Sequence, residues 1–153
     1  MAFSLGYWVW SFLAAPYPVP EDFINASPAT IVDHMLDSWT TQPGAFTPEV
    51  RAEYVRQFTD PDTVHAICEE YRAAATLDVE YDNADCGGKK IQCPLLALWA
   101  RDFSVAKWYD PLAVWSEWSD DVRGGAVDCG HFIPEEAPDY TVGQFRTFFG
   151  NPD

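Results

Sequence analysis

His131 stands in the segment Gly-His-Phe-Ile-Pro-Glu-Glu-Ala-Pro (residues 130–138), between a short apolar stretch and an amphipathic one. Gly130 lets the chain turn sharply, so we expect a strand-to-helix loop that places the histidine to reach across a pocket. Histidine takes up and returns a proton near neutral pH without a large change in pKa. These residue types favour a general base at His131. The alternative is an ordinary histidine on a surface loop.

Helices are expected over the first 80 or so residues, because a capping residue is followed by proline at several points. These pairs are Ser27-Pro28, Thr47-Pro48 and Asp60-Pro61, with Asp110-Pro111 and the weaker Ala137-Pro138 further on. Apolar residues then recur at helical spacing. The three stripes are Ile31, Val32, Met35, Leu36 and Trp39; Val50, Tyr54 and Phe58; and Val64, Ile67, Cys68, Tyr71, Ala74 and Ala75. The polar, glycine-containing stretch 82–90 indicates a boundary.

Beyond this boundary the pattern changes to that of a parallel sheet. Residues 94–100 form a continuous apolar run, which is typical of a strand buried on both faces. We expect a helix over 111–118, a weak strand around 126–127, the His131 loop, and a closing helix containing Val142, Phe145, Phe148 and Phe149. Strand, helix, strand, helix is the repeating unit of α/β folds. Two strands do not make a stable parallel sheet alone, so the pattern predicts the tail of such a fold.

Composition limits the classes of partner. The 153 residues carry a formal net charge of −15, which argues against nucleic acid and against an anionic membrane surface. Hydrophobic residues make up 48% and aromatic residues 16%, so the chain is globular, and its seven Trp indicate an aromatic pocket or a covered surface. The four Cys show no spacing typical of a metal site, so we expect reduced thiols, a cytoplasmic location and no metal.

The whole pattern resembles the haloacetate (fluoroacetate) dehalogenases of the α/β-hydrolase superfamily. The matching segments are residues 10–14, 16–21, 68–73, 95–99, 111–115 and 130–138. The resemblance implies an α/β class with a partial α/β-hydrolase fold: a helical cap (residues 1–85) followed by the last two parallel strands and two helices of the core (residues 91–153). The His131 loop alone fits many hydrolases, whereas the middle segments are more specific to this family.

The resemblance also implies a reaction. In this family an aspartate displaces halide from a small 2-haloacid, and a histidine-activated water hydrolyses the resulting ester. His131 matches that histidine, Trp10 and Tyr71 match halide donors, and Trp39 matches an aromatic residue on the pocket side of the cap. Trp10, Trp39 and Tyr71 could instead be core residues of their helices. No cofactor is implied, and a homodimer stays open.

The same resemblance implies that the nucleophile, the acid that orients the histidine and the substrate-binding arginines belong to sequence upstream of Met1. We therefore expect this chain alone to be inactive. Val9 stands where the family commonly has a third halide donor, a histidine. Asp102 follows the first strand, where many hydrolases place the acid of their triad, and is a weaker candidate. Glu135 and Glu136 are expected to lead into the closing helix.

Two other functions remain open. In an epoxide hydrolase-like enzyme, Tyr71 would donate to the epoxide oxygen together with a second cap tyrosine, for which Tyr54 and Tyr81 are weak candidates. In a non-catalytic truncated protein, exposed aromatic residues would bind a partner. His34 and His65 flank the apolar stripes of their helices and are expected to be surface histidines.

Overall fold

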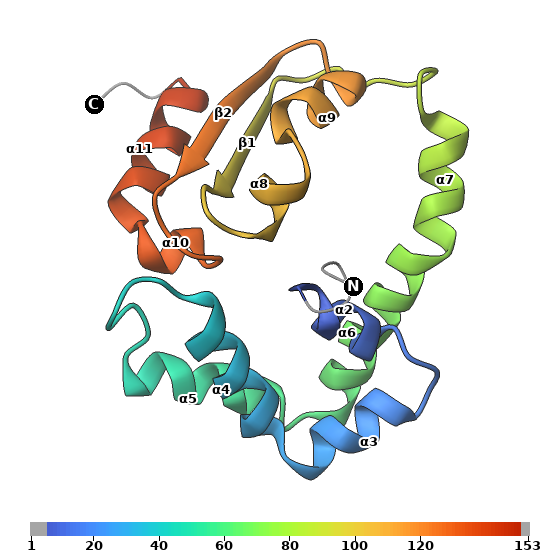
Figure 1. Cartoon of the computed structure of the whole chain (residues 1–153), viewed down its shortest axis with the longest axis vertical. Helices are drawn as coiled ribbons and strands as arrows, with labels where there is room; N and C mark the ends of the chain where they lie inside the picture. Colours follow the sequence, from blue (N-terminus) through green and yellow to red (C-terminus); the bar gives the residue numbers. More distant parts are fainter. Residues whose placement is uncertain (1–5, 151–153) are drawn as a thin grey trace. The chain divides into compact units, whose positions relative to one another are not determined.

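The computed structural model describes residues 6–150, in which a helical part of the chain is followed by a mixed part with two strands (Figure 1). The first part of the chain is helical. Its elements are α2 (Trp8–Leu13), α3 (Val19–Ala26), α4 (Pro28–Trp39), α5 (Pro48–Gln57), α6 (Pro61–Ala75) and α7 (Leu77–Asp85). The second part is mixed. Its elements are β1 (Leu95–Ala100), α8 (Ser104–Trp108), α9 (Pro111–Trp118), β2 (Val122–Val127), α10 (Ile133–Glu136) and α11 (Pro138–Phe148).

The predicted proline starts are confirmed. Helices α4, α5, α6, α9 and α11 each begin at the proline named from the sequence. The side chains of Thr47, Asp60 and Asp110 cap α5, α6 and α9 by accepting a backbone N–H of the first turn. Proline at the first position loses nothing, because that N–H has no partner inside the helix.

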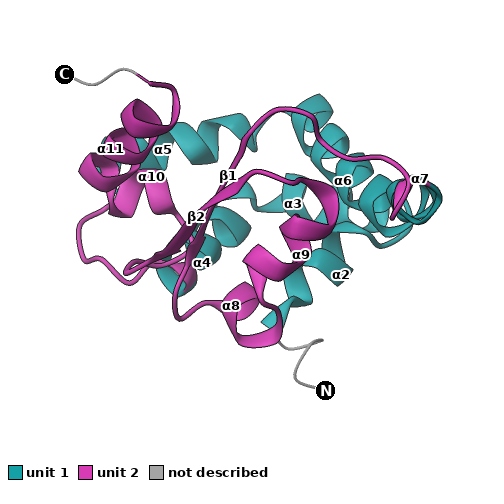
Figure 2. Ribbon diagram, turned by 90° about the horizontal axis from the view of Figure 1, so that it is seen from above, with its two compact units in different colours: residues 1–38, 46–84 teal, residues 39–45, 85–153 magenta. Residues whose placement is uncertain are grey.

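The chain divides into two compact units, each described by itself (Figure 2). The first comprises residues up to 38 together with 46–84, and the second comprises residues 39–45 together with the chain from Asp85 onward. The segment 39–45, which lies within the region predicted as the cap, therefore groups with the unit that contains the strands.

The core of the first unit lies where α2 and α3 pack on α6. Its buried side chains include Val9, Leu13, Ile24, Val64 and Cys68. The predicted stripe of α5 is not buried: Val50 is 40% exposed, and the helix contains no buried residue. Two ion pairs hold α5 instead, since Arg51 donates to Asp33 and Asp37 of α4 at 2.8 and 2.6 Å.

The second unit is built on β1 and β2, which pair in parallel from Leu95↔Val122 to Ala100↔Val127. Both predicted strands are confirmed, although β2 is longer than the two residues expected. Helices α8 and α9 pack on the strands, and Figure 1 shows α10 and α11 on their other side. The buried residues at the strand ends are Ala100, Val127 and Cys129.

One helix boundary and one short helix differ from the expectation. Helix α7 continues to Asp85, so the boundary stretch 82–90 is helical at its start. The short helix α8 was not predicted, because its five residues are too few to show a period.

The apolar residues of the closing helix α11 are largely exposed: Val142 and Phe145 are about half exposed, and Phe149 lies just beyond the end of the helix. Within residues 6–150, no helix combines the length and the apolar character that crossing a bilayer requires.

Candidate active site

His131 lies on the loop between β2 and α10, surrounded by three aromatic rings. Its ring centroid is 5.0 Å from Trp39, 4.9 Å from Phe103 and 5.1 Å from Phe132. An open cavity of about 170 Å³ adjoins it, lined by Leu98, Trp99, Ala100, Phe103, Val105, His131 and Ile133. His131 is nevertheless an exposed residue, so one side of its ring is open to solvent. A ring held by aromatic contacts but open on one side can reach a substrate or a water molecule.

This environment lowers the pKa of His131. Desolvation by the surrounding rings disfavours the imidazolium, and the negative charge of Glu136 opposes this only in part. The folded-state pKa therefore lies below 6.5, so the imidazole is neutral at neutral pH. A neutral imidazole is the form that accepts a proton from water.

Trp39 belongs beside His131 in the second unit. The backbone N–H of His131 donates to the Trp39 carbonyl at 2.9 Å, and the Trp39 ring stacks on Phe132 with centroids 6.3 Å apart. Trp39 is partly exposed at the end of α4, unlike the buried Ile31 and Leu36 of the same helix. The structure therefore brings together two of the four residues predicted for the site.

The other two, Trp10 and Tyr71, meet in the first unit. Their rings are 5.5 Å apart in an edge-to-face arrangement, and Trp10 is 40% exposed. Burial raises the pKa of Tyr71, with a smaller contribution from Glu70, so its hydroxyl keeps its proton at neutral pH. An indole N–H and a phenol O–H are both hydrogen-bond donors. Val9, beside Trp10 in the sequence, is only 2% exposed.

A buried carboxylate holds the helices that carry this ring pair. Glu21 of α3 accepts two hydrogen bonds from Arg72 of α6, at 2.7 and 3.0 Å, and Arg72 also donates to the Ala15 carbonyl just after α2. The Arg72 guanidinium lowers the pKa of Glu21 to about 2, despite desolvation by burial. Since Arg72 follows Tyr71 directly, this ion pair fixes the turn of α6 that faces Trp10.

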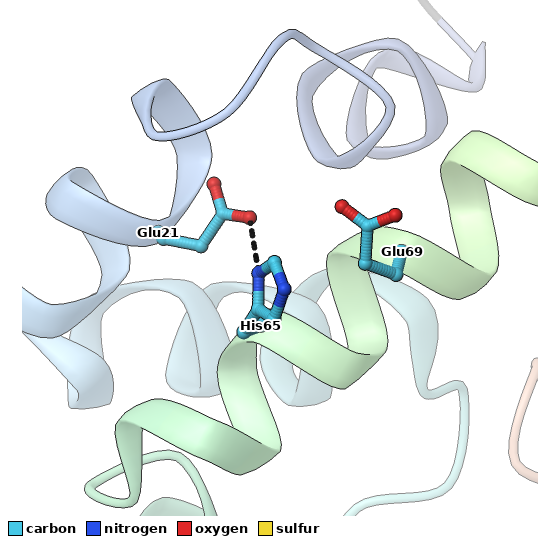
Figure 3. Close-up of side chains that lie close together, drawn as sticks. All are labelled: Glu21, His65 and Glu69. Atoms are coloured by element: carbon cyan, nitrogen blue, oxygen red, sulfur yellow. Dashed lines mark hydrogen bonds and ion pairs between the residues drawn. The ribbon is translucent and has the colours of Figure 1, made fainter.

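Figure 3 shows His65 and Glu69 of α6 beside Glu21, with the His65 Nδ1 3.2 Å from a Glu21 oxygen. One ligand atom from each of these residues lies within 4.8 Å of the others, which would suit a metal ion. Arg72, however, already pairs with both carboxylates, at 2.7 Å from Glu21 and 2.6 Å from Glu69. We interpret the group as an ion-pair cluster, in which His65 is a partnered surface histidine.

The weaker sequence candidates lie elsewhere. Asp102 is exposed in the turn after β1, and within residues 6–150 no hydrogen bond or ion pair joins it to His131. Tyr54 packs edge-on against Phe46, and Tyr81 is 61% exposed on α7. The ring that contacts Tyr71 is that of Trp10.

Glu136 does not play the role expected of it. The closing helix α11 begins only at Pro138, and the Glu136 carboxylate turns back to accept the backbone N–H groups of Gly130 and Phe132 at 2.9 and 3.0 Å. Glu136 is a functional candidate that the sequence did not reveal. Its other backbone donors, Thr41 and Gln42, lie 95 and 94 positions away in the sequence.

Comparison with known proteins supports an α/β-hydrolase. The chain is 34% identical to fluoroacetate dehalogenase from Burkholderia sp over 146 residues, which cover 95% of this chain and 48% of that enzyme. It is 33% identical to soluble epoxide hydrolase from Corynebacterium sp. (strain C12) over 108 residues, or 70% of this chain and 36% of that enzyme. The chain thus spans less than half the length of these curated relatives. No family model matches the sequence.

Solved structures agree on the fold. A protein from Nostoc sp PCC 7120 that is classed as an α/β-hydrolase is 41% identical, with a TM-score of 0.92. The similarity covers 99% of this chain and 52% of that structure. The two parallel strands and the preceding helices therefore form about half of a known hydrolase architecture.

Proposed function

Because this chain belongs to the α/β-hydrolases and is similar to fluoroacetate dehalogenase over about half of that enzyme's length, we propose that it provides the base-bearing half of a haloacid hydrolase. The environment of His131 carries the proposal: a neutral imidazole in an aromatic cage, open to a cavity at the end of a parallel strand. The substrate is a small 2-haloacid. The nucleophile and the acid that orients His131 come from sequence outside this chain.

The reaction has two steps. A carboxylate oxygen of the nucleophile bonds to the α-carbon of the substrate, and the carbon–halogen bond breaks with release of halide. Water then attacks the ester carbonyl while its proton passes to His131, and the ester bond breaks to give the 2-hydroxy acid and the free carboxylate. The Trp10 N–H and the Tyr71 hydroxyl donate to the departing halide.

Replacing His131 tests this order of steps. In a protein that joins this chain to the nucleophile-bearing half, His131→Ala blocks only the second step, so the ester should accumulate. After incubation with chloroacetate, mass spectrometry should find an adduct on the nucleophile-bearing peptide. His34→Ala, at an exposed histidine of α4, is the control and should turn over without an adduct. A His131→Ala protein that binds substrate but forms no adduct would contradict the proposed role.

The 153-residue chain by itself should release no halide from chloroacetate, since a base without a nucleophile cannot form the ester. Ion chromatography of the reaction mixture measures this directly. Halide release by the purified chain would show that a nucleophile lies among its own residues.

We further propose that the complete enzyme prefers chloroacetate or bromoacetate to fluoroacetate. Val9 offers no N–H donor, and a lost donor of this kind lowers kcat by roughly 10²–10³-fold. Fluoride needs such donors most, because its charge is concentrated on a small ion. Val9→His should therefore raise kcat/KM for fluoroacetate more than for chloroacetate. Since Val9 is 2% exposed, burying the imidazole costs about 1–3 kcal/mol of stability, which urea unfolding would register. Equal wild-type rates on both substrates would refute this preference.

Epoxide hydrolysis is the second candidate, favoured by the similarity to soluble epoxide hydrolase. Tyr71, protonated at neutral pH, would donate to the opening epoxide oxygen. Diol formation from styrene oxide by the complete protein, lost in Tyr71→Phe, would select this reaction over dehalogenation.

A further inference from the structure

The carboxylate of Glu136 gathers backbone N–H groups from two segments that are far apart in the sequence. Its Oε2 accepts from Thr41 at 2.7 Å, from Gln42 at 3.1 Å and from Gly130 at 2.9 Å. Its Oε1 accepts from Phe132 at 3.0 Å. A single side chain thus bridges segment 39–45 and the loop between β2 and α10.

These bonds bracket His131. Gly130 and Phe132, the residues on either side, donate to Glu136, and His131 itself donates to the Trp39 carbonyl at 2.9 Å. Three consecutive N–H groups are therefore anchored. The same bridge holds the segment that begins with Trp39, whose ring lies 5.0 Å from the imidazole.

Gly130 is adapted to this arrangement. A Cβ placed there would lie 2.4 Å from the Trp39 carbonyl oxygen and 2.6 Å from the Glu136 Oε1. Neither oxygen can easily move away from such a Cβ. The first belongs to the backbone, and the second belongs to a carboxylate that four N–H groups hold in place. Only glycine lets the loop approach the carboxylate this closely.

We propose that Glu136 is a positioning residue for His131, whose carboxylate locks the loop against segment 39–45 and so holds the imidazole in its aromatic cage. This inference rests on the base role proposed for His131. Charged acceptors make stronger hydrogen bonds than neutral ones, so the ionised carboxylate is the form that locks. Burial disfavours that form, but the N–H donors of Thr41, Gly130 and Phe132 outweigh it and leave the pKa of Glu136 below its usual value.

The test is NMR of the full chain without substrate. In Glu136→Gln, the amides of Thr41, Gln42, Gly130 and Phe132 should exchange with solvent about tenfold faster or more. The imidazole protons should lose the ring-current shifts caused by Trp39, Phe103 and Phe132. The pKa of His131 should rise toward 6.5 as the cage opens. Gly130→Ala, which keeps every charge, should produce the same changes. Asp139→Asn, which removes an exposed carboxylate in α11, should produce none.

Other outcomes overturn the proposal. Retained ring-current shifts with a further lowered His131 pKa would mean that Glu136 acts only as a charge. Loss of the β1–β2 amide signals in both variants would mean that it holds the whole unit. Equal changes in Asp139→Asn would mean that the loss of another carboxylate has the same effect, so that Glu136 has no special role in positioning His131. None of these signals depends on turnover. If the proposed hydrolysis proves wrong, the NMR result still decides whether Glu136 positions His131.

Discussion

Glu21 keeps a negative charge in a place that water hardly reaches, since its side chain is only 5% exposed. The bidentate contact with Arg72 stabilises the ionised form and lowers the pKa to about 2, against 4.5 for a free carboxyl. The unfolded chain therefore takes up a proton at higher pH than the folded one. The stability that Glu21 contributes is present in full above pH 4.5 and is lost as the pH falls toward 2.

Replacing Glu21 tests this contribution. Glu21→Gln removes the buried charge that pairs with Arg72 and leaves it only the more exposed Glu69, so the free energy of unfolding at pH 7 should fall by on the order of 3 kcal/mol. The difference from wild type should shrink as the pH is lowered from 4.5 to 2, because protonation then neutralises the wild-type carboxyl as well. Urea unfolding at several pH values measures both effects.

The matched control is Glu53→Gln. The pKa of Glu53 is also about 2, lowered mainly by Arg56, but both side chains are more than half exposed. Water and salt screen such a pair, so its removal should change stability little. A pH dependence of equal size in both variants would show that burial of Glu21 adds nothing.

Single residues were predicted from sequence where their signal is local. His131 was predicted because Gly130 and the neighbouring apolar stretch are next to it in the chain. Glu21 and Glu136 were missed because each has a partner far away in the sequence: Arg72 is 51 positions from Glu21, and Thr41 is 95 from Glu136. Nothing in the residues around Glu21 marks it as buried, and nothing around Glu136 marks it as the acceptor of these hydrogen bonds.

At the level of elements, β2 depends on a glycine where it faces β1. Gly124 pairs with Ala97 and has a φ of +122°, a conformation that L side chains rarely adopt. A Cβ at this position would lie 1.9 Å from the Ala97 carbonyl oxygen. The parallel pairing thus requires the absence of a side chain at this one register position.

Gly124→Ala should therefore destabilise the second unit far more than Gly125→Ala, whose Cβ would meet nothing within 4 Å. We expect a loss of roughly 3 kcal/mol or more for Gly124→Ala, since a strained backbone and a steric clash add together. Amide exchange along β1 and β2 locates the effect. Similar losses in both variants would contradict the pairing described here.

Element starts were predictable because the cap and the proline lie side by side in the sequence, as at Thr47-Pro48 and Asp60-Pro61. The two strands were also predictable, since an apolar run such as 95–100 suits a sheet interior. Helix α8 has only five residues and no period to detect. Segment 39–45 is joined to the second unit by hydrogen bonds with Glu136 and His131, which lie far along the chain, so its grouping could not be read from the segment itself.

At the scale of the whole molecule, 24 acidic residues face 9 basic ones, and the net charge is −15. Several ion pairs in the described part of the chain are exposed on both sides, so each of these contributes little. Repulsion among the remaining carboxylates opposes folding. Salt weakens both effects, and we expect the repulsion to dominate.

Added NaCl should therefore raise the Tm by a few degrees. Most of the rise should be complete by about 0.15 M, where the Debye length has fallen to about 8 Å. Calorimetry over a series of salt concentrations measures the curve. A fall in Tm would show that the ion pairs outweigh the repulsion, and a rise that continues linearly to high salt would indicate exclusion of salt from the surface instead.

Because the ring centroids of Trp39 and His131 are 5.0 Å apart, the fluorescence of Trp39 can report the protonation state of the candidate base. An imidazolium quenches the fluorescence of a neighbouring indole, whereas the neutral ring quenches it little. Acidification should therefore dim the emission of Trp39, with a midpoint below 6.5. Subtracting the spectrum of Trp39→Phe isolates this indole from the six others. The protein thus contains its own optical indicator of whether His131 is ready to accept a proton.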